Sequence, residues 1–298
     1  MERTSIVYKI RRKMQVIAHH FFSDETMSKL YFRIVLKKKL NLENPHTFNE
    51  KLQWLKLYYF PKEELVIQCA DKYAVRSYIV EKGYGDKLVP LLKSWEDAKD
   101  IDWDDLPEKF VLKCNHGCAY NLVCTDKLKL DKTKAVRQLS SWMSEDFGSF
   151  NIEPHYSAIK QHRIVCEEYL GESITDYKFF CFNGTPKYLY VSTDLIHDRQ
   201  AQIGFFYLDG SKMPLTRDDY TDIPSVKLPS FFDNMRKMAE NLSRDFPFVR
   251  VDFFLENNTY YFAELTFTPG ACMMPFNPEK FDLEWGKELD ISDLLSRK

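Results

Sequence analysis

The chain has 298 residues, 44% of them hydrophobic and 15% aromatic, which is enough apolar material for one large domain or two modest ones. Its formal net charge of −2 argues against a general nucleic-acid-binding protein, because such proteins carry a strong positive field. Seven cysteines without a Cys-x-x-Cys pair predict reduced thiols, and no apolar run approaches the roughly 18 residues of a membrane span. We therefore expect a cytoplasmic protein.

Positive charge is concentrated at the N-terminal end. Residues 1–56 contain 12 Lys and Arg against 5 Asp and Glu, a local charge of +7 against −9 for the remainder. This pattern is typical of a solvated helix face, but it also suits an acidic substrate or the anionic inner face of a membrane. The apolar stretch after the first basic residues is too short and too polar for a signal peptide.

Apolar spacing predicts helices over most of the first 81 residues. One helix is expected within residues 5–40. Thr47, followed three residues later by Glu50, is a capping-box pattern, so a second helix should begin there and end near Pro61. A third helix is predicted from about residue 63 to residue 81, before a loop rich in Gly and Pro.

A short hairpin is predicted next, with strands at 110–112 and 122–124. The segment between them, residues 113–121, has Lys113 at its root and Gly117 near its tip. The backbone N–H groups of such a turn could cover phosphates, although an ordinary hairpin is the alternative. The hairpin also gathers possible zinc ligands, but their spacing matches no common zinc pattern. These residues are Cys114, His116, Cys118 and Cys124.

The C-terminal half combines strands, hairpin turns and one amphipathic helix. The expected elements are a helix at 131–147, a strand at 163–170, hairpins around Asn183-Gly184 and Asp209-Gly210, a helix at 231–246, and a loop with a short last helix over 271–298. The chain is therefore α+β. It contains no Gly-x-Gly-x-x-Gly after a strand and no Gly-x-Ser-x-Gly, which disfavours a Rossmann domain and a serine hydrolase.

The most informative hairpin has predicted strands at 248–255 and 259–267. Asp252 and Glu264 lie inside its two apolar runs, and carboxylates are rarely buried without a partner. On paired strands they could share a divalent cation, with Arg250 on the same strand face as Asp252. A buried Arg–Asp–Glu ion-pair network that holds the hairpin together is the alternative.

Taken in order, these segments resemble the TupA-like ATP-grasp family of bacterial teichuronopeptide, capsule and exopolysaccharide synthesis. The resemblance extends from about residue 44 to residue 278 and is carried by five separate stretches. They are residues 44–56, 71–76, 113–117, 176–184, and 250–252 together with 264–270. It implies an α+β ATP-grasp fold, in which two α/β subdomains clasp ATP, with an added helical N-terminal region. The expected divisions are 1–70 for that region, 71–162 for the subdomain with the flap, and 163–298 for the subdomain with the metal site.

The resemblance also implies nucleotide-binding roles for particular residues. Lys72 and Lys113 match the two lysines that contact ATP phosphates, and residues 115–121 match the flap that covers them. The strand that holds adenine corresponds to residues 167–170, with Glu167 or Glu168 as its acidic residue. The candidate nucleotide-binding residues are Lys72, Lys113, Asn115, His116, Gly117, Glu167, Glu168, Tyr169 and Leu170. The flap contains less glycine than is usual in the fold, since Cys118 and Ala119 follow Gly117.

Residues near the reacting phosphate follow from the same resemblance. Asp252 and Glu264 match the Mg²⁺ ligands, and Arg250 matches the residue that reaches the transferring phosphoryl group. Thr266 stands where most ATP-grasp enzymes have an Asn ligand, so it is a candidate ligand with one hydroxyl oxygen instead of an amide carbonyl. Lys178 is a candidate contact to phosphate or to the substrate carboxylate, with a surface ion pair to Asp176 as the alternative.

The implied reaction is ATP- and Mg²⁺-dependent joining of a carboxylate to an amine through an acyl phosphate, in cell-surface polysaccharide synthesis. The carboxylate would be a uronic acid of a glycan, an amino acid or a peptide, and residues 1–60 and 193–229 are the expected places for acceptor recognition. The basic N-terminal part would suit peripheral contact with the inner membrane face. A sugar kinase, a glycosyltransferase and a nucleotide-binding scaffold without turnover are the alternatives. A glycosyltransferase would have to use the Asp-x-Asp pattern at 100–104.

Overall fold

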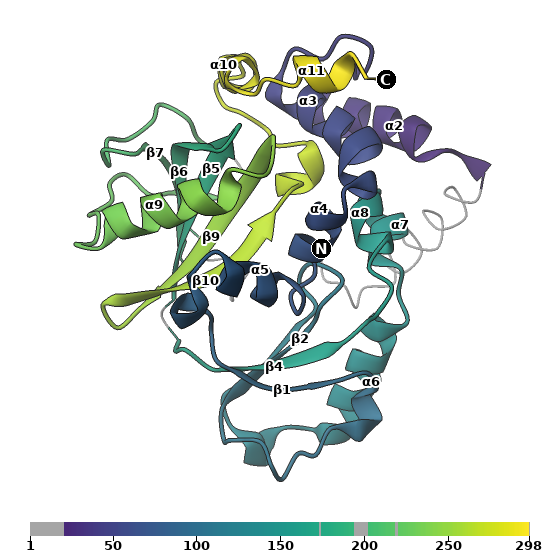
Figure 1. Cartoon of the computed structure of the whole chain (residues 1–298), viewed down its shortest axis with the longest axis vertical. Helices are drawn as coiled ribbons and strands as arrows, with labels where there is room; N and C mark the ends of the chain where they lie inside the picture. The colour runs from purple at the N-terminus through teal and green to yellow at the C-terminus, as the bar shows by residue number, and fades with distance from the viewer. Residues whose placement is uncertain (1–20, 173, 194–201, 218–219, 298) are drawn as a thin grey trace.

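The structure is a computed structural model that describes residues 21–172, 174–193, 202–217 and 220–297. Two β-sheets form its framework (Figure 1). The four-stranded sheet lies at the bottom of the view with α6 (Lys132–Met143), and the six-stranded sheet lies above it with α9 (Phe232–Ser243). The N-terminal helices and the last two helices come together at the top. No helix among these described ranges is long and apolar enough to cross a membrane.

The N-terminal helices are shorter than predicted. Of the helix expected over 5–40, the part before residue 21 lies outside the described residues, and the rest is α2 (Asp24–Leu36). Ser23 caps the start of α2 by accepting from Thr26 N at 3.2 Å, and Lys37 ends it in a left-handed conformation. The predicted capping box is confirmed, with Thr47 and Glu50 capping α3. The segment continues as α3 (Phe48–Trp54), a π-helix (Leu55–Tyr59) and a 3₁₀ turn (Phe60–Lys62).

The single helix predicted over 63–81 is wrong, because the chain turns between α4 (Glu64–Ala70) and α5 (Val75–Glu81). Asp71 is extended, and its carboxylate accepts from Tyr73 N at 2.7 Å and Ala74 N at 3.1 Å. An Asp that satisfies nearby backbone N–H groups competes with helix continuation. The turn also lets Lys72 N donate to Asn115 O of the flap at 3.1 Å. Lys72 is thereby placed between the helical region and the flap.

The four-stranded sheet is antiparallel throughout, in the order β1-β4-β2-β3. Its strands are β1 (Leu91–Trp95), β2 (Phe110–Cys114), β3 (Asn121–Cys124) and β4 (Ile164–Glu168). The predicted hairpin is confirmed as β2 and β3. The predicted subdomain boundary at residue 163 would place β4 in a different subdomain from the strands with which it pairs. The three-part division of the chain stays a prediction. Beyond α6 lie α7 (Phe147–Asn151) and α8 (Pro154–Ser157).

The six-stranded sheet has the order β10-β9-β5-β6-β7-β8 and is antiparallel except for the β7–β8 pair. Its strands are β5 (Thr175–Phe182), β6 (Thr185–Thr193), β7 (Gln202–Tyr207), β8 (Thr221–Asp222), β9 (Phe248–Glu256) and β10 (Thr259–Thr266). The Asn183-Gly184 hairpin is confirmed. The turn at Asp209-Gly210 gives only a bridge between Phe206 and Lys212.

Alternation along the strands gives this sheet two buried faces. Phe179 faces α9, where its ring centroid lies 5.4 Å from that of Phe232. Its neighbour Phe180 points to the opposite face and packs on Trp285 at 4.8 Å. Trp285 belongs to α10 (Lys280–Glu288), and Phe48 of α3 lies 5.4 Å from it. The first and last parts of the described chain therefore cover the same face of the sheet.

The C-terminal segment contains two helices rather than the one predicted, α10 and α11 (Ser292–Leu295). Lys51 of α3 donates to Gly286 O at 2.8 Å and Leu289 O at 2.6 Å, which satisfies carbonyl groups at the end of α10. A Cβ at Gly286 would lie 2.2 Å from His46 O, so glycine permits this close approach. Short 3₁₀ turns occur at Gly85–Lys87, Ala98–Asp100, Lys127–Lys129 and Pro269–Cys272.

Candidate active site

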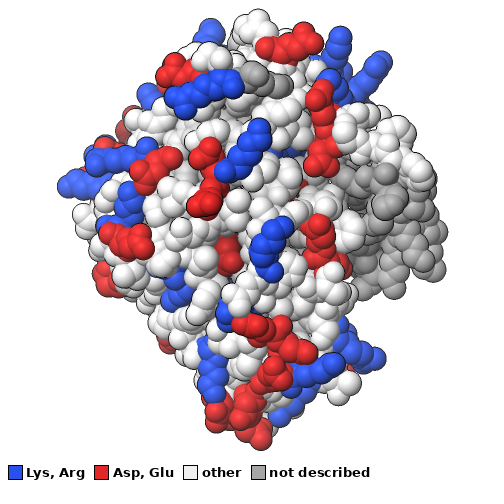
Figure 2. All heavy atoms as spheres, turned by 45° about the vertical axis from the view of Figure 1, so that its right-hand side comes forward, with Lys and Arg blue, Asp and Glu red and all other residues white. Residues whose placement is uncertain are grey.

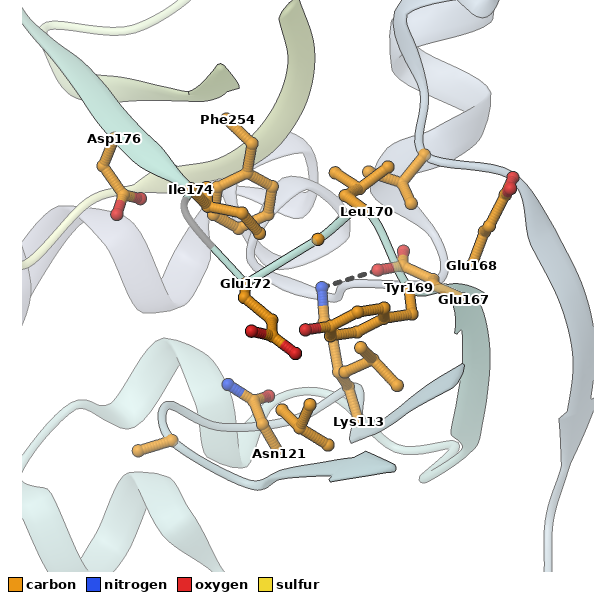
Figure 3. Close-up of a pocket in the computed structure, with 15 residues that line it drawn as sticks. Lys113, Asn121, Glu167, Glu168, Tyr169, Leu170, Glu172, Ile174, Asp176 and Phe254 are labelled. Atoms are coloured by element: carbon orange, nitrogen blue, oxygen red, sulfur yellow. Dashed lines mark hydrogen bonds and ion pairs between the residues drawn. The ribbon is translucent and has the colours of Figure 1, made fainter. Parts of the chain in front are cut away.

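A cleft between the two sheets consists of two adjoining cavities of about 380 Å³ and about 270 Å³. The larger cavity, which we call the apolar pocket, is lined mainly by Val89, Val111, Val123, Tyr169, Leu170, Ile174 and Phe254 (Figure 3). The smaller one, the charged pocket, is lined by Lys72, Arg76, Lys113, Asp176, Lys178, Asp252 and Glu264, among others. Lys113 and Glu167 line both cavities and mark their junction.

The apolar pocket contains the segment for which adenine binding was predicted. Glu167, Glu168, Tyr169 and Leu170 all line it. Glu168 is exposed and points away from the centre of the pocket, whereas Glu172 points into it (Figure 3). Sequence analysis missed Glu172, since no pattern distinguishes it from other loop carboxylates. Apolar side chains beside an irregular backbone offer a planar heteroaromatic ring both stacking surfaces and hydrogen-bonding groups.

The charged pocket is built on a row of register partners across three strands. Glu264 of β10 pairs with Asp252 of β9, which pairs with Lys178 of β5. Arg250 binds Asp252 through two bonds, Nε to Oδ1 at 2.7 Å and Nη2 to Oδ2 at 2.5 Å. Lys178 Nζ donates to Asp252 Oδ2 at 3.2 Å and to Asp176 Oδ1 at 3.0 Å. The ion pair predicted between Lys178 and Asp176 is therefore present, but it is buried and not on the surface.

Burial and ion pairing act in opposite directions on the pKa values of the groups in this network. Burial disfavours the charge of Glu264, but Lys72, Arg250 and Lys178 outweigh it and lower the pKa of Glu264 to about 2. Burial also opposes the charges of Arg250 and Lys178, and Asp252 is the main reason that the pKa of each is raised. Burial raises the pKa of Asp176, against the lowering effect of Lys178. Asp252 is 0% exposed, so its two cationic partners are essential to burying it.

The carboxylate pair fits Mg²⁺ that arrives with a polyphosphate. Mg²⁺ typically binds one or two carboxylates and takes its remaining ligands from substrate phosphates and water. Among the described residues, no three His, Cys, Asp or Glu side chains form a group that could hold a metal ion. This finding gives the zinc alternative no support. Thr266 Oγ1 donates to Glu264 Oε1 at 2.9 Å and accepts from Arg250 Nη2 at 3.0 Å, so it belongs to the same network.

The flap is tied to the charged pocket through Lys72. Lys72 Nζ donates to Gly117 O at 2.5 Å, while Cys118 and Ala119 line the pocket. Gly117 is required by packing, because a Cβ there would lie 2.8 Å from the Phe147 ring and 2.9 Å from Tyr120. The flap residues that line the pocket are Cys118, Ala119 and Asn121, which lie within the predicted flap of residues 115–121 but beyond the binding candidates Asn115, His116 and Gly117.

The side chains of Asn115 and His116 are used within the protein instead of in the cleft. Asn115 Nδ2 donates to Asp71 Oδ2 at 2.7 Å and to Gln161 O at 3.0 Å, and its Oδ1 accepts from Arg163 N at 2.7 Å. His116 stacks on His162 with ring centroids 3.6 Å apart. Burial, followed by the neighbouring His162, lowers the pKa of His116 to about 4. Both residues anchor the base of the flap.

Glu167 is bound by two cations from different elements. Lys113 Nζ of β2 lies 2.5 Å from Glu167 Oε2, and Arg76 Nη1 of α5 lies 3.3 Å from Glu167 Oε1. Arg76 was not predicted to belong to the site. No local pattern in the sequence indicated it, because Lys72 lies in the turn before α5 and the carboxylate that Arg76 binds is 91 residues away.

A second buried polar cluster lies behind the charged pocket. Thr268 Oγ1 donates to Glu153, and Lys56 contributes a nearby positive charge, with each of the three residues less than a tenth exposed. Gln53 Nε2 of α3 donates to the carbonyl groups of Ala271 and Cys272, at 3.3 and 3.2 Å. Both residues have positive φ, a conformation that side chains with a Cβ disfavour. The cluster thus fixes the chain just beyond Thr266.

The two sheets, antiparallel except for the β7–β8 pair, and the cleft between them are those of an ATP-grasp ligase fold. A sequence model described as TupA-like ATPgrasp matches residues 50–290, and the chain belongs to the TupA-like ATP-grasp family. No match is found among curated protein sequences.

Several solved structures are similar to this chain at low sequence identity. D-alanine–D-alanine ligase from Helicobacter pylori is 15% identical, with a TM-score of 0.49 over 83% of this chain and 70% of that one. L-amino acid ligase from Bacillus licheniformis is 14% identical, with a TM-score of 0.45 over 84% of this chain and 57% of that one. D-alanine–D-alanine ligase from Bacillus anthracis complexed with ATP is 13% identical, with a TM-score of 0.42 over 67% of this chain and 55% of that one. The chain thus spans little more than half the length of the two Bacillus ligases.

The buried cluster at Glu153 predicts a pH-dependent stability. Burial is the largest influence on Glu153 and raises its pKa from 4.5 to about 7, against the lowering effects of Thr268 and Lys56. Between about pH 4.5 and pH 7, the folded protein therefore keeps the Glu153 proton whereas the unfolded chain has released it. The stabilisation that comes from this bound proton is fully present below about pH 4.5 and is lost as the pH rises through 7.

We expect Glu153→Gln to remove this dependence. From pH 5 to pH 8, the free energy of unfolding of the wild type should fall relative to the variant by on the order of 2 kcal/mol. Urea unfolding at a series of pH values measures the difference, with Glu279→Gln on an exposed residue as the control. Parallel profiles for wild type and Glu153→Gln would show that Glu153 is ionised in the folded protein.

Proposed function

We propose that the protein is an ATP- and Mg²⁺-dependent carboxylate–amine ligase of bacterial cell-surface polysaccharide biosynthesis. The observation that carries the proposal is the cross-strand pair Asp252 and Glu264, set among lysines and arginines beside a pocket of about 380 Å³. Its membership of the TupA-like ATP-grasp family supports the reaction class. In this proposal the adenine ring lies in the apolar pocket against Tyr169 and Leu170, and the phosphates extend into the charged pocket.

The chain's own residues would neutralise and orient the polyphosphate. Lys72 and Lys113 line the pocket from the helical region and the small sheet, whereas Arg250 of the large sheet lies behind the carboxylate pair, where it binds Asp252 and lies 3.5 Å from Glu264. Fixed positive charges in a site that excludes water stabilise charge developing on a transferring phosphoryl group. Mg²⁺ held by Asp252 and Glu264 would neutralise further phosphate charge when bound. Lys178 is placed to hold Asp252 in position through a direct ion pair.

The proposed reaction has two steps. A carboxylate oxygen of the substrate attacks the γ-phosphorus of ATP, the bond to ADP breaks, and an acyl phosphate forms. The amine nitrogen then attacks the acyl carbon, phosphate leaves, and the amine gives up a proton as the amide forms. No protein nucleophile is needed, and the nearby thiols are poor candidates, since burial raises the pKa of Cys118 to about 11 and that of Cys114 to about 12.

The substrates in this proposal are a uronic acid of a glycan, an amino acid or a peptide, together with an amine. The glycosyltransferase alternative loses its support, because the Asp-x-Asp pattern lies in surface turns. Asp102 and Asp104 are exposed and bonded to each other, Asp104 N donating to Asp102 Oδ1 at 3.1 Å. A kinase acting on a sugar hydroxyl is the remaining alternative, because it would use the same nucleotide site.

The two chemistries are separated by trapping the intermediate. With ATP, Mg²⁺ and hydroxylamine, we expect ADP release that depends on one member of a panel of uronic acids, amino acids and peptides, and a hydroxamate should form from that carboxylate. Hydroxylamine intercepts an acyl phosphate but not a phosphorylated sugar. ADP release without hydroxamate, with phosphate retained on the acceptor, would instead establish a kinase.

Variants at the carboxylate pair test the metal assignment. Glu264→Gln or Asp252→Asn should lower ATP turnover by roughly 10²–10³-fold, because a preorganised charged contact is lost. Steady-state ADP release measures this, and circular dichroism checks that each variant is folded. Glu264→Gln is the sharper variant, because the Glu264 side chain is 34% exposed whereas Asp252 is fully buried. Normal turnover in both would show that the pair does not serve as the metal site.

We further propose that the basic N-terminal part contacts an anionic lipid surface. In the view of Figure 2, basic and acidic side chains are interspersed and form no large patch of one sign. The proposal therefore rests on the charge asymmetry of residues 1–56 in the sequence. Liposomes containing anionic lipid should bind the protein in sedimentation at physiological salt, and neutral liposomes should not. Equal recovery in the supernatant with both would exclude the contact.

A further inference from the structure

Lys113 is engaged by a carboxylate at the junction of the two pockets. Its Nζ lies 2.5 Å from Glu167 Oε2, with side chains that are 15% and 10% exposed (Figure 3). The same Nζ lies 5.6 Å from the ring centroid of Phe254. An ammonium group is a compact charge on a flexible stem, so Lys113 can turn from Glu167 toward a phosphate. Glu167 and the phosphate would then compete for the Lys113 ammonium group.

Glu167 has a second partner that does not depend on Lys113. Arg76 Nη1 lies 3.3 Å from Glu167 Oε1, and Arg76 Nη2 donates to Val89 O at 2.9 Å. The backbone contact fixes the guanidinium while it faces the carboxylate. Glu167 therefore lies between a movable cation from β2 and an anchored cation from α5.

This arrangement decides whether Lys113 can be released. If Lys113 turned to a phosphate and Glu167 had no other partner, a carboxylate that is only 10% exposed would be left uncompensated. Leaving one charge of a buried pair without its partner is strongly unfavourable. Arg76 removes this penalty, because it remains bound to Glu167 after Lys113 has moved.

Building on the proposed function, we propose that Glu167 and Arg76 form a latch in which Glu167 holds Lys113 until a polyphosphate displaces it, and Arg76 retains Glu167. Arg76 is thus a positioning residue, which acts on the nucleotide through Glu167 and Lys113 without contacting phosphate. The side chain of Glu167 serves to hold or release Lys113, while the neighbouring backbone remains available to bind the adenine base.

A double-mutant cycle on nucleotide affinity tests the latch. Calorimetric titration with Mg²⁺ and a non-hydrolysable ATP analogue is carried out on the wild type, Arg76→Ala, Glu167→Gln and the double variant. Arg76→Ala should weaken binding by about 10- to 100-fold, within the range of coupling between contacting charged groups. Glu167→Gln should bind at least as tightly as the wild type. The affinity of the double variant should be within about threefold of that of Glu167→Gln, because Arg76 has no carboxylate to bind once Glu167 is replaced.

Two further variants complete the design. Arg76→Lys keeps the charge next to Glu167 and should recover most of the lost affinity. Arg236→Ala removes an arginine that pairs with Asp233 on the exposed side of α9, and should leave affinity unchanged. Thermal melting of every variant separates a loss of affinity from a loss of fold.

Each outcome has a distinct meaning. Additive effects of Arg76→Ala and Glu167→Gln would show that Arg76 acts on the nucleotide directly and would overturn the latch. Arg76→Ala could also lower the melting temperature. If the double variant with Glu167→Gln melts at the same lowered temperature, Arg76 has a structural role, and the latch would also be overturned. Wild-type protein that binds no nucleotide would overturn the proposed function and the latch together, whereas binding with an additive cycle would overturn the latch alone.

Discussion

The pairing of buried Asp252 with two cations is the interaction on which the site depends. This carboxylate is completely buried in the large sheet, where Arg250 binds both of its oxygens and Lys178 binds one of them. Removing a charge from water is costly unless a partner is supplied, so the three strands must keep their register. The same register places Glu264 beside Asp252 and orients both toward the cleft.

The wall of the cleft that faces the large sheet supplies cations that are each bound to a group of the protein. Its cations stand on a turn and near the end of a strand, with Lys72 in the turn between α4 and α5 and Lys113 in β2 at the root of the flap. Each is held by a protein group, Gly117 O for Lys72 and Glu167 for Lys113. The large sheet therefore supplies the carboxylate pair, whereas the turn after α4 and the smaller sheet supply cations that, in the proposed arrangement, exchange a protein partner for phosphate. This division is suited to binding and releasing a polyphosphate.

The helical N-terminal region is part of the same construction. Phe48 and Trp285 pack together on the large sheet, and Gln53 binds the left-handed residues that follow β10. Consecutive left-handed residues with a Cβ are unfavourable, so this turn depends on partners outside the strand. The helices thus determine where the chain goes immediately after Thr266, beside the paired carboxylates.

Local patterns in the sequence determined the parts of this protein that depend on near neighbours. The Thr47–Glu50 cap, the Asn183-Gly184 turn and the hairpin carrying Asp252 and Glu264 are formed by residues close together in the chain. Five ordered segments also sufficed to indicate the family.

Only the tertiary structure decided how distant groups are partnered. The break at Asp71 depends partly on Asn115, the burial of Lys178 depends on Asp252, and the pairing of Arg76 with Glu167 joins a helix to a strand 91 residues away. Likewise, Asn115 and His116 looked like nucleotide contacts, yet their side chains hold the base of the flap. A sequence states which charges exist, but the balance between burial and pairing is set only when folding brings distant segments together.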